Sequence, residues 1–226
     1  MGGRSFPSPQ LLAFAGPLGV FMALLVVLPT LQLPIRTNLA VWLIACTASI
    51  LIWSWRVLEF RPARPAMSVL IGIGVFLVWV APDVLFPGWR QHWLFQNPVF
   101  GELKTSLPAD ALTDNAALTM RVLRATLVVP IVEELFWRGW LMRWLIVPDF
   151  ETVPLGAYTR SSFWLVALLF ALEHGPYWDV GLMAGVAYNL WMIRTKRLSD
   201  LILCHAVTNG CLCLYILRTG QWEYWL

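Results

Sequence analysis

The stretch Val129–Trp140 (VPIVEELFWRGW) contains two adjacent glutamates and an arginine in a run that is otherwise apolar. Ionised side chains inside an apolar segment are costly unless they are paired or face a polar cavity, which makes them candidates for function. Glu134 and Arg138 are four residues apart, one turn of a helix, so we expect an ion pair between them. Glu133 then has no obvious local partner, and a desolvated glutamate of this kind can serve as a general base.

The composition around this stretch is that of a polytopic membrane protein. The chain has 226 residues, of which 59% are hydrophobic and 13% are charged, and its mean hydropathy is +0.68. Spans of roughly 20 residues plus connections leave room for about seven or eight helices. We therefore expect an all-α transmembrane helix bundle that forms a single membrane domain over residues 1–226. The net charge of +3 comes from scattered arginines, so nucleic acid is not an expected partner.

Seven apolar segments are predicted to be spans. We divide them into N-terminal spans within residues 1–86, an interfacial loop with a surface helix at 87–115, and a motif-bearing catalytic core at 116–217. The long fourth segment should be tilted, kinked near Pro130, or project from the bilayer. The predicted spans are Leu11–Leu28, Asn38–Trp55, Met67–Phe86, Ala116–Val147, Ser162–Glu173, Val180–Ile193 and Leu198–Leu217.

The distribution of cations predicts the orientation. Arg56, Arg61 and Arg64 lie between the second and third spans, and the run Arg194–Arg197 (RTKR) lies between the sixth and seventh. Loops rich in arginine and lysine face the cytoplasm. With seven spans, both loops are cytoplasmic if the N-terminus, which carries Arg4, is cytoplasmic as well.

Three further polar residues lie in two other apolar spans. His174 ends the sequence FALEH, and His205 and Asn209 lie one helical turn apart in HAVTN. A histidine and an asparagine on one helix face can both donate hydrogen bonds to a developing oxyanion. Phe170 is expected to pack beside this site, whereas Glu173, next to a glycine at a helix end, is expected at the membrane interface.

The absence of other protease motifs narrows the chemistry. The sequence has no HExxH zinc motif, no GxSG nucleophile and no GxGD aspartate pair. A glutamate that acts on water remains. Glu133, His174 and His205 could also form a zinc site with an open position for water, and spacing alone does not separate the two interpretations.

The segments EELFWRG, FALEH and HAVTN resemble the EExxxR, FxxxH and HxxxN motifs of the CAAX prenyl protease-like family, also called type II CAAX endopeptidases or the CPBP family. All three occur in the family's order, within roughly Ala116–Leu217. The resemblance implies an intramembrane glutamate protease of about eight helices with a cavity open toward the cytosol or lipid. It implies no cofactor, with zinc left open.

The resemblance also implies roles for individual residues. Glu133 would activate water, His174 would help to position that water, and His205 and Asn209 would form the oxyanion site together with His174. The supporting residues would be Glu134, Arg138 and Phe170.

The expected partners are membrane lipid and a peptide or protein substrate with a membrane-associated terminus. The expected location is a bacterial cytoplasmic membrane. The substrate itself does not transfer with a fold. The alternative is a non-catalytic binding, immunity or scaffold protein that retains the pocket. A small transporter is less well supported, because no repeated halves with paired broken helices are found.

One feature of this topology needs an explanation. His174 lies at the non-cytoplasmic end of the fifth span, whereas His205 lies only seven residues, roughly 10 Å, from the cytoplasmic start of the seventh. The two histidines should be close in a working site. We therefore expect the break at residues 175–178 to dip into the bundle, where irregular backbone is allowed if it lines a cavity.

Overall fold

The computed structural model describes residues 8–225, so the N-terminal stretch with Arg4 lies outside the described residues. Those residues form a bundle of seven helices without a β-strand, which confirms the predicted fold class. The helices are Pro9–Val27 (α1, extended by a 3-10 turn to Leu31), Ile35–Ser49 (α2, extended by a π-helical turn to Ser54), Pro65–Leu85 (α3), Asn115–Trp144 (containing α4, α5 and α6), Arg160–Glu173 (α7), Trp178–Thr195 (α8) and Leu198–Thr219 (α9).

These helices match the seven predicted spans in order, and each end lies within three residues of its predicted position. Five of them are long and apolar enough to cross a membrane. α7, with 14 residues, is too short for that, and α8 is not among the five. Five of the seven predicted spans are therefore long and apolar enough to cross a membrane, whereas the short fifth span (α7) and the sixth (α8) do not meet that criterion. The chain is a multi-pass membrane protein.

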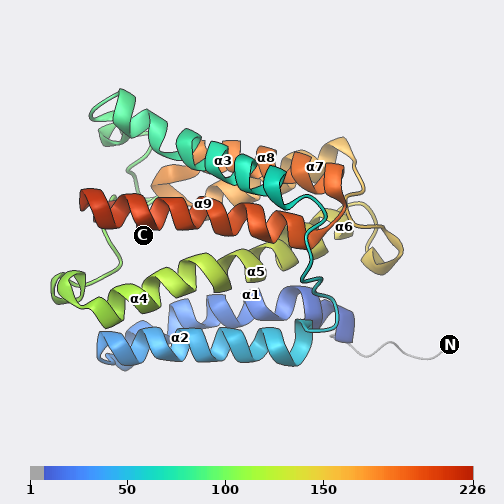
Figure 1. The fold of residues 1–226 in the computed structure, drawn as a ribbon, viewed down its shortest axis with the longest axis horizontal. Coiled ribbons are helices and arrows are strands. Elements are labelled where there is room, and N and C mark those ends of the chain that lie inside the picture. The colour runs from blue at the N-terminus through green and yellow to red at the C-terminus, as the bar shows by residue number, and fades with distance from the viewer. Residues whose placement is uncertain (1–7, 226) are drawn as a thin grey trace.

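Successive helices are antiparallel, so the links between them lie at two ends of the bundle (Figure 1). Residues 55–64, 145–159 and 196–197 lie at one end of the bundle, which we call the cationic end because it carries both arginine-rich links. Residues 32–34 and 86–114 lie at the other end, together with the end of α9. We call this the opposite end.

Close contact between α3 and α9 holds the middle of the bundle together. A Cβ atom on Gly72 of α3 would lie 2.4 Å from the carbonyl oxygen of Cys204 on α9, so only a glycine permits this approach. The hydroxyl of Thr208 donates to the carbonyl of Gly72 at 3.0 Å. α1 and α2 form a pair on the far side of the long helix (Figure 1).

The long helix is irregular on both sides of Pro130. Its regular segment α5 (Val129–Glu134) lies between two π-helical segments, Arg124–Val128 and Leu135–Leu141. A proline inside a helix lacks the N–H that would continue the hydrogen-bond ladder, and π-helical turns are frequent at functional sites. The helix is therefore irregular on both sides of Pro130, where a kink was one of the three predicted alternatives.

The segment 86–114 contains no α-helix, so the predicted surface helix is wrong. It has 3-10 turns at Trp89–Gln91 and Ala109–Thr113. Arg90, which is 3% exposed, holds the segment down. Its Nη1 donates to Asp179 at 2.6 Å and to the carbonyl of Pro176 at 2.8 Å, and its Nε donates to Asp83 at 3.1 Å. These tertiary bonds replace a regular interfacial helix.

Candidate active site

A cavity of about 580 Å³ lies inside the bundle, between α1, α3, the long helix, α7, α8 and α9. It brings together residues that lie far apart in the sequence. Of the residues singled out from the sequence, five are on its wall, while Glu134 and Arg138 lie behind it. The five are Glu133, Phe170, His174, His205 and Asn209.

Glu133 faces the cavity from α5, and 6% of it is exposed. Its Oε2 accepts no hydrogen bond within the part of the chain that the structure describes. The Nε2 atom of His205 lies 4.0 Å from Oε2, which is longer than a hydrogen bond. A carboxylate oxygen is thus held in the wall with its hydrogen-bonding capacity unused.

Glu134 is fully buried and is shared by two donors. Arg138 Nη1 donates to both of its oxygens, at 3.1 and 3.0 Å, so the expected ion pair is present. His205 Nδ1 lies 2.7 Å from Oε1. Because the arginine requires an ionised carboxylate, Nδ1 of His205 carries the proton and donates it to Glu134. The Nε2 atom of His205 is therefore the one on the side of Glu133.

Arg138 connects the long helix to α7 and α8. Its Nε donates to Asn189 Oδ1 at 2.9 Å, its Nη2 donates to the carbonyl of Gly185 at 3.3 Å, and its guanidinium lies 4.6 Å from the centre of the Phe170 ring. Asn189 in turn donates to the carbonyl of Phe163 at 2.8 Å. A buried arginine with this many partners fixes the position of Glu134, and through it that of His205.

His174 follows directly after α7. Its Nδ1 lies 2.7 Å from the carbonyl oxygen of Phe170. A carbonyl can only accept, so Nδ1 carries the proton and Nε2 of the neutral ring is an acceptor. The ring of Phe170 contacts both histidines, with centroid distances of 4.6 Å to His174 and 6.1 Å to His205.

The break after α7 lies inside the protein. Pro176 and Tyr177 of the 3-10 turn at Gly175–Tyr177 are buried. α7 is short and ends within the bundle, so His174 reaches the same cavity as His205. The two histidines thus line one cavity, as the sequence analysis required of a working site.

Asn209 lies one turn beyond His205 on α9. Its Nδ2 donates to the carbonyl of Ala125 at 2.8 Å. Ala125 belongs to the first π-helical segment of the long helix, where the regular pattern of helical hydrogen bonds is interrupted. This bond fixes the amide and leaves its second N–H and its Oδ1 for other partners.

The cavity wall also contains residues to which the sequence assigned no role in the site. Glu173 was expected at the interface, but it lines the cavity and accepts a hydrogen bond from Trp137 Nε1 at 3.0 Å. The sequence feature that could have placed Glu173 in the site is its position next to His174. Tyr188 packs its ring 5.0 Å from that of His205 and donates to Thr208 at 2.8 Å. Nothing in the sequence pattern distinguishes Tyr188 from a packing residue.

Metal binding can be checked against the side chains that the structure places together. Within residues 8–225, no group of three His, Cys, Asp or Glu side chains is arranged to hold a metal ion. The geometry thus offers no ready-made form of the zinc site considered from the sequence.

Comparison with known proteins gives one match. A family model described as "Type II CAAX prenyl endopeptidase Rce1-like" matches residues 115–211. The matched segment begins at the first residue of the long helix and ends within α9, and it contains Glu133, His174, His205 and Asn209. No curated protein and no solved structure gave a match.

Proposed function

We propose that this protein is a membrane protease that hydrolyses a peptide bond near a membrane-embedded terminus of its substrate, because residues 115–211 match the model of the Rce1-like type II CAAX prenyl endopeptidase family. One observation above all supports the proposal. The carboxylate of Glu133, with one oxygen free of hydrogen bonds, faces the same cavity as His174, His205 and Asn209.

In this proposal Glu133 is the general base. It removes a proton from water, whose oxygen bonds to the carbonyl carbon of the scissile peptide. The C–N bond then breaks, and the proton passes from Glu133 to the leaving amine. Proton transfer of this kind contributes typically about 10²–10⁴-fold to the rate.

His205 and Asn209 are the proposed donors to the oxyanion. Nδ1 of His205 is already bonded to Glu134, so Nε2 can donate only when the imidazole is protonated. Asn209 would contribute the N–H that its bond to Ala125 leaves free. Hydrogen-bond donors fixed in advance are the efficient way to stabilise charge that develops in the transition state.

His174 presents a hydrogen-bond acceptor to the cavity, whereas His205 and Asn209 are proposed as donors. With Nδ1 bonded to the Phe170 carbonyl, its neutral ring presents an acceptor at Nε2. We assign it the positioning of the attacking water, which needs an acceptor to orient one O–H while Glu133 takes the other proton.

We place the cationic end of the bundle in the cytoplasm of a bacterial cell, with the N-terminus on the same side. The supporting observation is the charge of the links there, which carry Arg56, Arg61, Arg64 and Arg194–Arg197. We treat the chain as one membrane domain in which residues 116–217 are the catalytic core. The N-terminal helices contribute to the cavity wall through Phe21 and Trp79.

The first prediction concerns Glu133→Gln, which keeps the shape of the side chain but removes the base. We expect peptide release in liposomes to fall by about 10²–10⁴-fold. The matched control is Glu102→Gln, because the side chain of Glu102 is 75% exposed and is not part of the cavity wall. Candidate substrates would come from comparing the C-termini of membrane proteins in cells that produce the wild type or Glu133→Gln.

Equal release by the wild type and Glu133→Gln would disprove the role of Glu133. Loss of activity with chelators, together with stoichiometric zinc in the purified protein, would favour the zinc-dependent version. A phenotype that survives substitution of Glu133, His174 and His205 would favour a non-catalytic binding protein.

A further inference from the structure

Glu173 is a carboxyl group of the cavity wall to which the proposed hydrolysis assigns no role. Its Oε2 accepts a hydrogen bond from the indole Nε1–H of Trp137 at 3.0 Å, and an indole is a neutral donor. Within residues 8–225, no arginine, lysine or histidine side chain forms an ion pair with it. Arg138, whose charge reaches Glu173, is bonded instead to Glu134. The carboxylate of Glu173 therefore lacks a direct cationic partner, and a cation brought to it would be stabilised.

The carboxyl of Glu173 is held beside the residues proposed for the chemistry. Glu173 directly precedes His174, and its hydrogen-bond donor Trp137 lies one helical turn after Glu133 on the long helix. The two glutamates are close enough for their charges to interact. A group bound at Glu173 would therefore lie close to the bond on which Glu133 and His174 are proposed to act.

A second cavity, of about 500 Å³, adjoins the first between α1, the long helix and α7. Glu173 and Met22 line both cavities, so the two meet at these side chains. Among the lining residues of the second cavity that the structure describes, Glu173 is the only charged one. A Cβ atom on Gly19 would meet no neighbouring heavy atom within 4 Å, so the space beside α1 is open. Glu173 is thus a single carboxylate at the junction of the catalytic cavity with an apolar space.

We propose that Glu173 binds a basic side chain of the substrate, a lysine or an arginine, close to the bond that is cleaved. The aliphatic stem of this side chain would lie along the apolar wall beside Met22 and Phe170, and its charged group would meet Glu173 where the two cavities adjoin. Lysine and arginine combine a long apolar stem with a terminal positive charge, which matches an apolar wall that carries one carboxylate. The proposal rests on the proposed function, because it adds a sequence preference to that same site.

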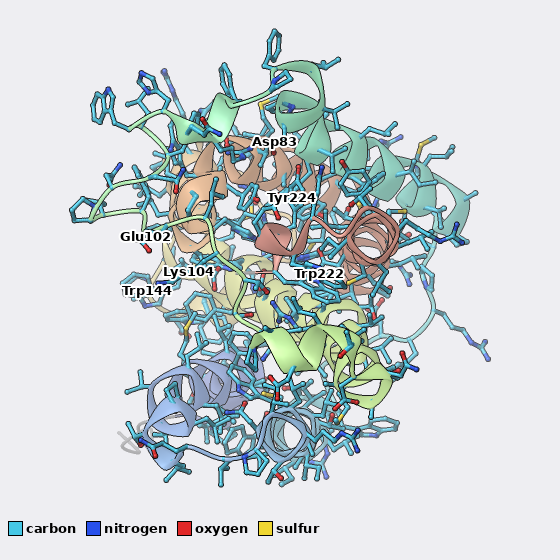
Figure 2. The ribbon with its side chains drawn as sticks, turned by 90° about the vertical axis from the view of Figure 1, so that its left-hand side faces the viewer. Asp83, Glu102, Lys104, Trp144, Trp222 and Tyr224 are labelled. Atoms are coloured by element: carbon cyan, nitrogen blue, oxygen red, sulfur yellow. The ribbon has the colours of Figure 1, made fainter. Side chains whose placement is uncertain are left out.

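The test measures binding rather than cleavage. The probes are two fluorescent, N-palmitoylated heptapeptide amides of alanine whose central residue is either lysine or norleucine, which has a similar stem without the charge. Acylation leaves the lysine as the only amine of the peptide. Their affinities are measured by fluorescence anisotropy in uncharged maltoside micelles, with Glu133→Gln as the background so that the peptides stay intact. The matched control for Glu173→Gln is Glu102→Gln, which removes the same charge at the periphery of the molecule (Figure 2).

We expect the lysine peptide to bind about tenfold more tightly than the norleucine peptide, on the scale of one hydrogen bond to a charged group. Adding Glu173→Gln should abolish this preference, whereas adding Glu102→Gln should leave it unchanged. Glu173→Lys should reverse it, so that a peptide with a central glutamate binds more tightly than the lysine peptide. A merely structural role for Glu173 would not produce such a reversal.

Equal binding of the two peptides, including no binding of either, would overturn the proposal, and so would a lysine preference that survives Glu173→Gln. These measurements need no hydrolysis. They therefore stand apart from the comparison of peptide release by the wild type and Glu133→Gln, which tests the proposed function.

Discussion

The buried carboxylate of Glu134 accepts hydrogen bonds from two different side chains. Its two oxygens accept from Arg138, and one of them also accepts from Nδ1 of His205, at a site from which water is excluded. Removing one partner of a buried ion pair leaves the other charge uncompensated, which costs more than the pair contributes. Glu134 is therefore needed for folding and for the proposed chemistry at once.

The second prediction separates these two effects. Glu134→Gln should destabilise the protein by about 3–5 kcal/mol, because Arg138 would keep its charge at 0% exposure without a counter-ion. The free energy of unfolding in mixed micelles measures this. The double variant Glu134→Gln, Arg138→Met should recover part of the loss, since it removes both charges and keeps an apolar side chain of similar length.

A Glu134→Gln variant as stable as the wild type would contradict this account. Recovery of stability without recovery of peptide release in the double variant is the expected sign that Glu134 also acts on His205.

At the level of single residues, the sequence predicted most of the residues of the site but few of the hydrogen bonds between them. It identified the polar residues of the apolar spans, because the free-energy cost of burying them is evident within one segment. It also identified the pairing of Glu134 with Arg138, because their spacing of four residues lies within one helix. The bond from His205 to Glu134 joins α9 to the long helix, and no spacing within one segment reports it. Glu173 was expected at the interface because it lies at a helix end next to Gly175, whereas in the structure it lines the cavity.

At the level of elements, Arg90 is a buried arginine that connects residues 86–114 to several helices, as Arg138 connects the helices around the site. It is 4% exposed at the side chain, bonds to Asp83 and Asp179, and lies 4.3 Å from the centre of the Tyr177 ring. It thereby holds together the end of α3, the turn before α8, and α8 itself. Those elements carry part of the cavity wall.

The third prediction follows from this arrangement. Arg90→Met should loosen residues 86–114 and lower stability by roughly 1–3 kcal/mol, the range for losing hydrogen bonds to charged groups. Limited proteolysis should then cut this segment faster than in the wild type. Arg218→Met is the matched control, since Arg218 is an exposed arginine near the same end of the bundle.

If Arg90→Met and Arg218→Met are cleaved at the same rate as the wild type, Arg90 does not hold the segment. The comparison uses cleavage in residues 86–114 only, because a general loss of folding would expose every link.

Hydropathy predicted the ends of the helices along the chain, but not how deep in the bundle each helix ends. The ends of all seven lie within three residues of prediction, because the change from apolar to polar residues marks where a helix stops. Neither the depth at which α7 ends nor the absence of a surface helix at 86–114 follows from that change. Both depend on tertiary contacts, through the buried Tyr177 in the first case and Arg90 in the second.

At the level of the whole molecule, the short α7 has a consequence for the lipid around it. With 14 residues it is about 21 Å long, whereas the hydrocarbon core of a bilayer is about 30 Å thick. Its outer face is apolar, with Trp164, Leu165 and Leu172 exposed by 46%, 44% and 54%. Lipid tails must shorten or tilt to cover that face, so the bilayer should be thinner there than beside α3 or α9.

The fourth prediction follows from this mismatch. Peptide release should rise as the acyl chains of the liposome are shortened, because thinner bilayers need less deformation beside the wall that carries His174. A mismatch costs fractions of a kcal/mol per Å, so a few ångströms should change the rate by a few-fold and up to about tenfold. Rates that do not vary with chain length would contradict it. If they do vary, membrane thickness itself becomes a control on this site, set by the lipids the cell makes rather than by a ligand.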